Sequence, residues 1–281
     1  MRIRILVLAA LVIASFAVLA FADDPFYLYQ RGAFGASGNI SLESETAYGN
    51  RETMLLGADV VEQGIRVRIS GTDWLSFEGW GGTAFHTTNN TETGARSRDT
   101  AASGDVYARL LNQDGQYVNL SLGLGYLYDY DQTSIPRVRV TISRSWRDLD
   151  VTFGTVAELP IKKTASEAAR DSDADSDDEH DPVDLIFSAA CSYGITDWAR
   201  VGVESVLEDA EGFWERDEAE GGAKMILGPT AFFSVYDNLY LRFNAGSVIA
   251  LTSNTPTVGT TTTAPNRVGF LGRMAVGYTF R

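Results

Sequence analysis

Apolar and polar residues alternate along most of the chain from residue 116 onward. In the clearest segment, 117–130, one face carries Val118, Leu120, Leu122, Leu124, Tyr126 and Tyr128. The opposite face carries mostly Asn, Ser and Gly. Because successive side chains of a strand point to opposite faces, this period of two predicts strands that are apolar on one side and polar on the other. Segments 137–146, 150–161, 239–251 and 267–280 repeat the pattern, which predicts an all-β chain.

The periodic segments and the turn residues between them predict about twelve strands. They are 53–61, 65–71, 74–87, 104–112, 116–130, 137–146, 150–161, 184–195, 199–208, 223–236, 239–253 and 267–280. An alternative makes 40–48 the first strand and 53–71 one long bent strand, and totals of ten or fourteen also stay open. Pro229 has no N–H for a sheet ladder, so we expect a bulge there or a strand that starts near Thr230.

The connections between these strands alternate between short and long. Short turns are predicted at 72–73, 114–115, 147–149, 196–197 and 237–238, where Asp, Asn, Gly and Thr gather. Long connections are predicted at 89–103, 131–136, 162–183, 209–222 and 254–266. Tight turns at one end and long loops at the other are typical of transmembrane β-barrels, whose strands are apolar outward and polar inward.

The N-terminus has the features of an export signal. Arg2 and Arg4 precede an apolar run over 5–19, and Ala20-Phe21-Ala22 fits a cleavage site. The run is shorter than the roughly 20 residues that a spanning helix needs. We therefore expect residues 1–22 to be a cleaved signal peptide and residues 23–281 to form the barrel.

The segment 267–280 ends on Tyr278-Thr279-Phe280. An apolar-out, polar-in strand with this aromatic pair resembles the closing strand of bacterial outer-membrane β-barrel proteins, although Arg281 follows the aromatic here. The resemblance covers the signal peptide and about residues 65–281, and it does not extend to a subfamily. It implies a single antiparallel up-and-down barrel in a Gram-negative outer membrane. The partners it implies are outer-membrane lipid, lipopolysaccharide, periplasmic chaperones and the barrel assembly machinery.

Aromatic residues gather close to the predicted turns and to the closing end. An aromatic belt at a membrane–water interface has this distribution. The predicted interface aromatics are Trp74, Trp146, Trp198, Tyr240, Tyr278 and Phe280.

Net charge, hydropathy and the cysteine count exclude several classes of protein. A formal net charge of −14 argues against nucleic acid as a partner. A mean hydropathy of −0.08 is too polar for a helical membrane protein and agrees with a barrel that has a polar lumen. The single cysteine, Cys191, excludes an intrachain disulfide, and its apolar neighbours predict a packed side chain. The sequence does not distinguish a monomer from a homo-oligomer.

Alternation also sends charged side chains into the barrel, with cations in excess. The predicted channel-lining residues are Arg109, Arg137, Arg139, Glu158, Arg200, Glu204, Lys224, Arg242 and Arg273. Such charges either form an ionic network that fills the interior or line a wet passage. We expect a passive porin-like channel for small hydrophilic, anionic solutes. The alternative is a plugged structural or surface-interaction barrel that acts through its acidic outer loops.

A second alternative is an outer-membrane hydrolase, for which His86 and His180 are the available histidine bases. Neither has the sequence context of a serine hydrolase, so we expect no enzyme activity and no cofactor. The acidic run 171–181 resembles the start of a calcium-binding loop but lacks the glycine and the final glutamate of that loop. We expect a solvated acidic loop without a defined metal site.

Overall fold

The structure is a computed structural model that describes residues 37–50, 60–86, 98–128, 134–159, 183–208, 210, 223–251 and 268–280. The strands within them are β1 (Ile40–Gly49), β2 (Val60–Ser70), β3 (Leu75–His86), β4 (Arg98–Leu111), β5 (Asn119–Tyr128), β6 (Ser134–Trp146), β7 (Leu149–Glu158), β8 (Asp184–Thr196), β9 (Ala199–Glu208), β10 (Lys224–Ser234), β11 (Leu239–Ala250) and β12 (Val268–Phe280). Among these residues no helix is long and apolar enough to cross a membrane.

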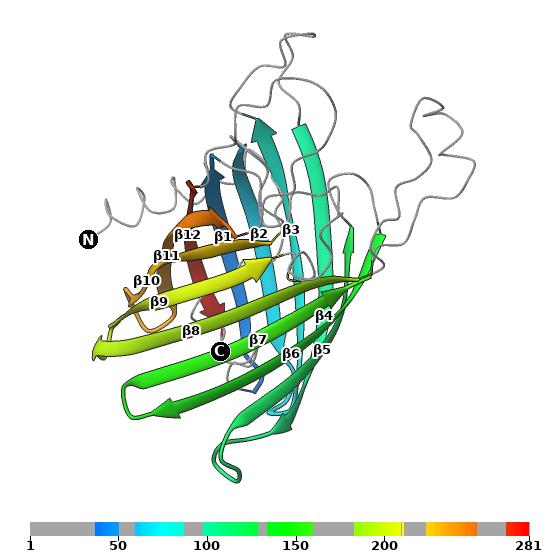
Figure 1. Cartoon of the computed structure of the whole chain (residues 1–281). Helices are drawn as coiled ribbons and strands as arrows, with labels where there is room; N and C mark the ends of the chain where they lie inside the picture. Colours follow the sequence, from blue (N-terminus) through cyan, green and yellow to red (C-terminus); the bar gives the residue numbers. More distant parts are fainter. Residues whose placement is uncertain are drawn as a thin grey trace, which may run out of the picture.

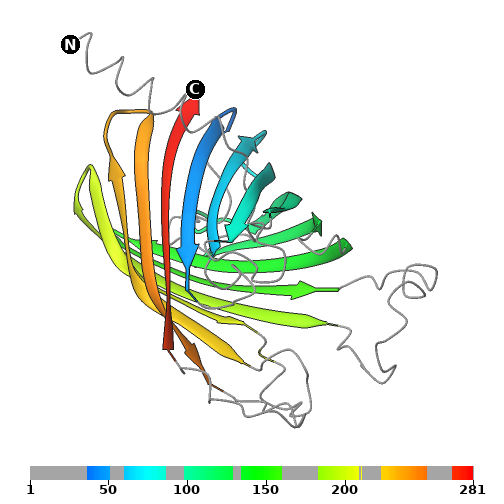
Figure 2. The same cartoon turned by 90° about the horizontal axis from the view of Figure 1, so that it is seen from above.

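The strands form one closed antiparallel barrel (Figure 1). Each strand pairs with the next in the sequence, and β12 pairs with β1 from Ile40 opposite Phe280 to Gly49 opposite Leu271. Seen from above, the strands follow one another around a ring (Figure 2). The all-β, up-and-down barrel with twelve strands is therefore confirmed, and the totals of ten and fourteen are excluded.

The N-terminal strands correct the main sequence prediction. The first described strand is β1, as in the alternative, and the predicted break at 62–64 is wrong, because β2 is continuous from Val60 to Ser70. Residues 53–59 of the predicted strand at 53–61 lie outside the described residues. Glu62 and Gly64 lie in this predicted break. Both face the lumen, where Gly64 lies against the indole of Trp80, so neither residue ends the strand.

Two other boundaries also differ from prediction. β4 begins at Arg98, because residues 98–103 pair with β3, so the predicted connection 89–103 is too long. Small and polar residues there gave no periodic signal. β10 runs through Pro229 without a bulge or a late start. Instead, Gly228 and Pro229 pair with β9 and leave a gap in the ladder to β11, because proline has no N–H to donate.

One end of the barrel carries the short turns, at the five predicted places. In the β2–β3 turn the Thr72 hydroxyl accepts hydrogen bonds from the backbone N–H groups of Trp74 and Leu75. In the β6–β7 turn Arg147 has a positive φ of 52°. We call this the short-turn end and the other the long-connection end.

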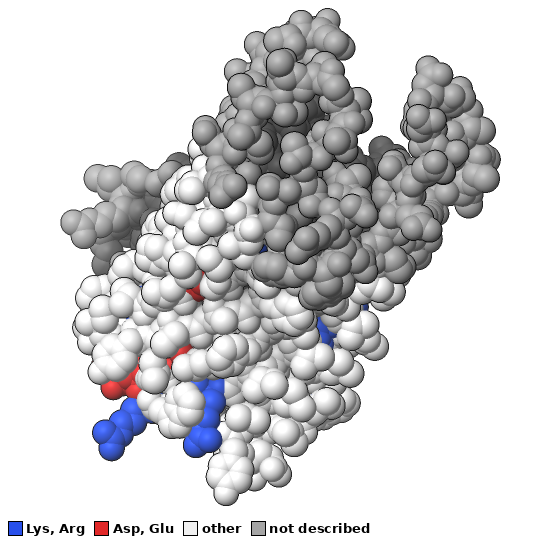
Figure 3. All heavy atoms as spheres, viewed as in Figure 1, with Lys and Arg blue, Asp and Glu red and all other residues white. Residues whose placement is uncertain are grey.

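Apolar side chains cover the outer face of the barrel. Leu124, Phe153, Val203 and Val268 are each more than half exposed on different strands. Figure 3 shows one side of the barrel, where most of the visible described surface is uncharged and charged atoms gather at the lower end. An outward apolar surface of this kind is what a barrel needs to lie in lipid.

Candidate functional site: the inner wall of the barrel

The inner wall arises from the same alternation that makes the outer face apolar. On β1, for example, Glu43 and Glu45 are 3 and 5 % exposed, and the intervening positions point outward. A buried charge is costly unless it has a partner, so the contacts of these side chains decide how the interior is built.

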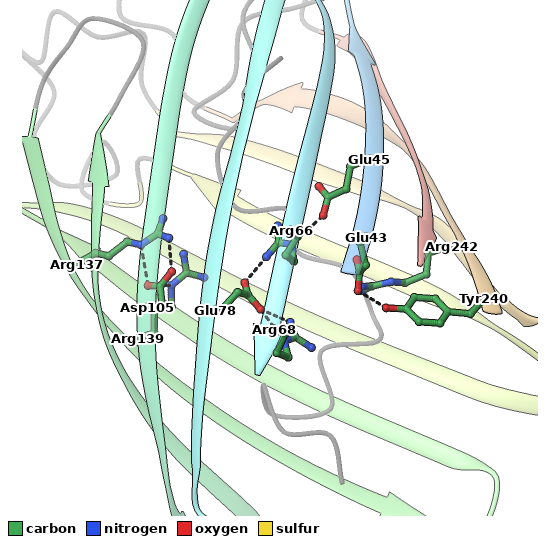
Figure 4. A network of polar contacts seen from close by, with 10 residues as sticks. All are labelled: Glu43, Glu45, Arg66, Arg68, Glu78, Asp105, Arg137, Arg139, Tyr240 and Arg242. Atoms are coloured by element: carbon green, nitrogen blue, oxygen red, sulfur yellow. Dashed lines mark hydrogen bonds and ion pairs between the residues drawn. The ribbon is translucent and has the colours of Figure 1, made fainter. Parts of the chain in front are cut away.

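Figure 4 shows the central group of inward polar side chains, which we call the ion-pair belt. Its members come from strands far apart in the sequence and meet on the inside of the barrel. They are Glu43, Glu45, Arg66, Arg68, Glu78, Asp105, Arg137, Arg139, Tyr240 and Arg242.

The first part of the belt crosses β1, β2 and β3. Glu78 accepts hydrogen bonds from both Arg66 and Arg68, the latter from Nε at 2.7 Å. The Nε of Arg66 also donates to Glu45 at 2.8 Å. Arg66 thus links carboxylates on both neighbouring strands, and this arrangement compensates the burial of all three charges.

The second part of the belt joins β4 to β6 across β5. Arg137 donates two hydrogen bonds to Asp105, from Nε at 3.0 Å and from Nη2 at 2.6 Å. Gly125 is the β5 residue in register with both. A Cβ on Gly125 would collide with the Asp105 carboxylate, so the ion pair requires a glycine on the intervening strand. The Nε of Arg139 lies 3.5 Å from the same carboxylate.

The third part joins β11 to β1 across β12. Glu43 accepts hydrogen bonds from Arg242 and, at 2.6 Å, from the Tyr240 hydroxyl. Gly277 is in register with both Glu43 and Tyr240, and Ala275 with both Glu45 and Arg242. These small side chains on β12 leave room for the contact to pass over the strand.

Similar contacts occur elsewhere on the inner wall. Arg200 on β9 forms an ion pair with Asp150 on β7 at 2.6 Å, across β8. Asn244 on β11 donates to Glu204 on β9 at 3.0 Å, across β10. Polar side chains in this barrel therefore repeatedly reach the second-neighbour strand.

A second set of inward side chains lies nearer the long-connection end. Each strand has at least one buried apolar residue in this set, between 0 and 7 % exposed, and nine of the twelve form one contact cluster. Register places Leu127 beside Ile135 and Ile226 between Val206 and Val248. The set consists of Ala47, Val60, Ala84, Ala101, Leu127, Ile135, Val156, Ile186, Val206, Ile226, Val248 and Leu271. Charged side chains interrupt it, because Glu62 is in register with both Ala47 and Ala84, and Arg139 is in register with Val156.

The structure brings many of the predicted channel-lining residues inward. Arg137, Arg139, Glu158, Glu204, Arg242 and Arg273 are buried. Arg137 lies 3.8 Å from Glu158. Arg109 and Lys224 are half-buried, opposite Ser121 and Glu208 respectively. Whether a passage runs along these side chains stays a prediction.

The predicted interface aromatics divide into two groups. Exposed side chains at the short-turn end are Trp74, Trp146, Trp198, Tyr278 and Phe280, each 41–58 % exposed. Tyr240 differs: it faces the lumen and bonds to Glu43, because its even position places it with Arg242 and not with the outward Leu239 and Leu241.

The predicted excess of cations on the inner wall is wrong for the described residues. Buried carboxylates that the sequence prediction missed are Glu43, Glu45, Glu62, Glu78 and Glu208. Glu43, Glu45 and Glu62 lie outside the strands of the main prediction, so that prediction gave them no inward position. The alternation of Glu43 and Glu45 with Leu42, Ser44 and Thr46 was the signal that would have found two of them.

Other predictions fall partly or wholly outside the described residues: the signal peptide 1–22, most of the long connections, the acidic run 171–181, His180 and the side chain of His86. In the described part of the chain no group of His, Cys, Asp or Glu residues is arranged to hold a metal ion. Cys191 is exposed, not packed, because it faces outward from β8.

No protein-family profile matches the chain, and no curated protein sequence is significantly similar to it. Solved structures are similar in fold. The COG4313 outer-membrane channel from Pseudomonas putida F1 is 13 % identical, with a TM-score of 0.54, over 92 % of this chain and 100 % of that one. The NanC porin is 9 % identical, with a TM-score of 0.54, over 84 % and 98 %.

The KdgM porin, solved in complex with disordered oligogalacturonate, is 9 % identical, with a TM-score of 0.50, over 86 % of this chain and 99 % of that one. At these identities the likeness shows the fold alone. The chain has the fold of the bacterial outer-membrane β-barrel proteins.

Proposed function

We propose that this chain is a passive outer-membrane channel for small solutes. The observation that carries the proposal is the contrast between the two faces of the barrel: apolar side chains on the outside, and charged side chains from strands all around the ring on the inside. A polar, charged interior is what the water-filled channels among outer-membrane barrels have. The fold similarity to channels and porins is consistent with this role.

The charge pattern limits the solute class. Arginines of the ion-pair belt lie against carboxylates, as Arg66 does with Glu45 and Glu78. Paired charges of opposite sign largely cancel each other's field at a distance. We therefore infer small solutes and only a weak preference between anions and cations, and we assign the protein no catalytic step.

A second candidate function is a plugged barrel that acts through its outer connections. It is favoured by the burial of the belt, where Arg137 and Glu43 are 2 and 3 % exposed. Side chains that line an open water-filled pore are normally wet, so this burial favours a filled interior at the level of the belt.

Single-channel recording in a planar lipid bilayer separates the two candidates. The mature protein is refolded in detergent, and folding is verified by the altered gel mobility of the unheated sample. Discrete conductance steps, with a reversal potential near zero in a tenfold KCl gradient, are expected for the proposed channel. Stable insertion without conductance, in the wild type and in variants of the ion-pair belt alike, would contradict the proposed channel and favour the plugged barrel.

A further inference from the structure

Arg144 on β6 is the exception to the separation of charged and apolar faces in this barrel. Among the strand residues whose side chains the structure describes, it is the one charged residue that faces outward, because it lies two positions from the outward Ile142 and two from the outward Trp146. The other charged side chains described on the strands lie at inward positions. Arg144 is therefore on the face of the barrel that contacts lipid.

The described neighbours of Arg144 on the outer face are apolar or aromatic. Its register partner on β7 is Val151, and the next outward pair toward the middle of the barrel is Ile142 with Phe153. No ion pair joins Arg144 to a carboxylate in the described part of the chain. A charge held against apolar surface is costly unless it has a partner, so a counter-charge from outside the protein is favourable here.

The aromatic ring of Trp146 holds the Arg144 guanidinium in place. The guanidinium carbon lies over this ring, 4.9 Å from its centroid. A guanidinium that stacks on an aromatic ring still has the N–H donors in its own plane, and this planar set of donors matches two oxygens of a phosphate group. The ring therefore orients the cation and leaves its donors for a ligand.

The short-turn end sets the depth of this pair in the membrane. Trp146 is 46 % exposed and is the last residue of β6. Leu149 on β7 is in register both with Trp146 and with Tyr193 on β8, which is 55 % exposed. Trp and Tyr side chains gather at the level of the lipid headgroups. Arg144 lies two residues, or about 7 Å, further along the strand, and a side chain of its length reaches back to that level.

We propose that Arg144 and Trp146 form a binding site for an anionic phospholipid, in the membrane leaflet at the short-turn end. The phosphodiester of the lipid accepts hydrogen bonds from the Arg144 guanidinium, and its hydrocarbon chains lie along the outward apolar side chains of β6 and β7. An anionic lipid is favoured over a zwitterionic one, because the cationic group of a zwitterionic headgroup competes with Arg144 for the phosphate. The site is on the outer face and is independent of the proposed channel function.

The experiment measures which lipid lies beside Trp146. A single-tryptophan variant keeps Trp146, has phenylalanine at the other tryptophan positions, and is refolded into phosphatidylcholine vesicles. A minor fraction of the lipid is brominated near the headgroup and is either phosphatidylglycerol or phosphatidylcholine. Because bromine quenches a tryptophan only at short range, the ratio of the two quenching efficiencies reports the local preference for the anionic lipid. If replacement of the inward Trp80 prevents folding, this tryptophan is retained in all variants.

Two comparisons accompany this measurement. Arg144→Gln removes the charge, and a single-tryptophan variant that keeps Trp198 is the matched control. Trp198 is 57 % exposed at the same end of the barrel, and its described ring contact is with Phe233. We expect a preference for phosphatidylglycerol of about threefold at Trp146. The preference should be absent at Trp198, and Arg144→Gln should abolish it at Trp146.

Equal preferences at Trp146 and Trp198 would overturn the inference, as would a preference at Trp146 that Arg144→Gln leaves unchanged. If the Arg144→Gln variant does not fold, the comparison of Trp146 with Trp198 decides alone. Loss of the preference in inorganic phosphate, but not in chloride at the same ionic strength, would assign the site to free phosphate and overturn its assignment to a lipid. None of these measurements records conductance, so failure of the channel function and failure of this site are distinguishable.

Discussion

Glu43 on β1 and Arg242 on β11 form an ion pair across β12, although they lie 199 residues apart in the chain. The contact crosses the strand that closes the barrel, where Gly277 and Ala275 leave space above the backbone. Closure of the barrel therefore combines two interactions: the hydrogen-bonded ladder of β1 with β12, and a side-chain bridge to the strand beyond it.

Removal of the Glu43 carboxylate should destabilise the closed barrel. We expect Glu43→Ala to lower the free energy of unfolding by about 3 kcal/mol, because it leaves Arg242 buried without this carboxylate. The measurement is equilibrium unfolding by guanidinium chloride in lipid vesicles, followed by tryptophan fluorescence. Asp197→Ala, at an exposed turn position, is the control, with an expected change below about 0.5 kcal/mol. Equal stability of the two variants would contradict the role given to this bridge.

Gly277, which lies in register with Tyr240, should matter for the stability of the barrel as the Glu43–Arg242 ion pair does. A Cβ on Gly277 would collide with the Tyr240 ring, so Gly277→Ala is expected to cost about 1 to 3 kcal/mol of stability. In a Tyr240→Ala background the same substitution should cost much less, because the obstructing ring is gone. A double-mutant cycle measures this difference.

Gly79→Ala provides the matched control for that cycle, since a Cβ there meets no atom within 4 Å. An equal cost of Gly277→Ala in the presence and absence of the Tyr240 ring would refute steric coupling between the two residues.

Ion selectivity should shift in opposite directions when opposite members of the belt are neutralised. Glu78→Gln leaves Arg66 and Arg68 with less compensating negative charge, so the reversal potential in a KCl gradient should move toward anion preference. Arg66→Gln should move it toward cation preference. Shifts of the same sign, or none in conducting samples of both variants, would mean that the belt does not face the ion path.

Tryptophan fluorescence can locate the barrel in the membrane. Trp74 and Trp198, 58 and 57 % exposed at the short-turn end, should be quenched strongly by lipids brominated near the headgroup and weakly by lipids brominated at the chain end. Trp80, which is 5 % exposed and faces inward, should be quenched little by either lipid. Variants that retain a single tryptophan provide the comparison, and strong quenching of Trp80 would contradict its inward placement.

The sequence by itself determined the local properties of this chain. Because side chains alternate along every strand, the period of two was enough to predict the all-β class, twelve strands, the inward position of Arg137 and the short turn at Thr72. The period of two did not predict the strand boundaries correctly where the alternation is weak. Glu62 and Gly64 fall in the predicted break between 53–61 and 65–71, although both face the lumen of a continuous strand.

Tertiary structure decided which inward residues meet. Register and closure bring Asp105 to Arg137 over Gly125 and Glu43 to Arg242 over β12, and no local pattern contains these pairings. Because of these pairings, the inner wall carries paired charges of both signs and not the excess of cations that the sequence predicted. Register likewise decides which inward apolar residues are neighbours, as when Ile226 lies between Val206 and Val248. Alternation is a property of one strand, whereas a ring of contacts is a property of the closed barrel.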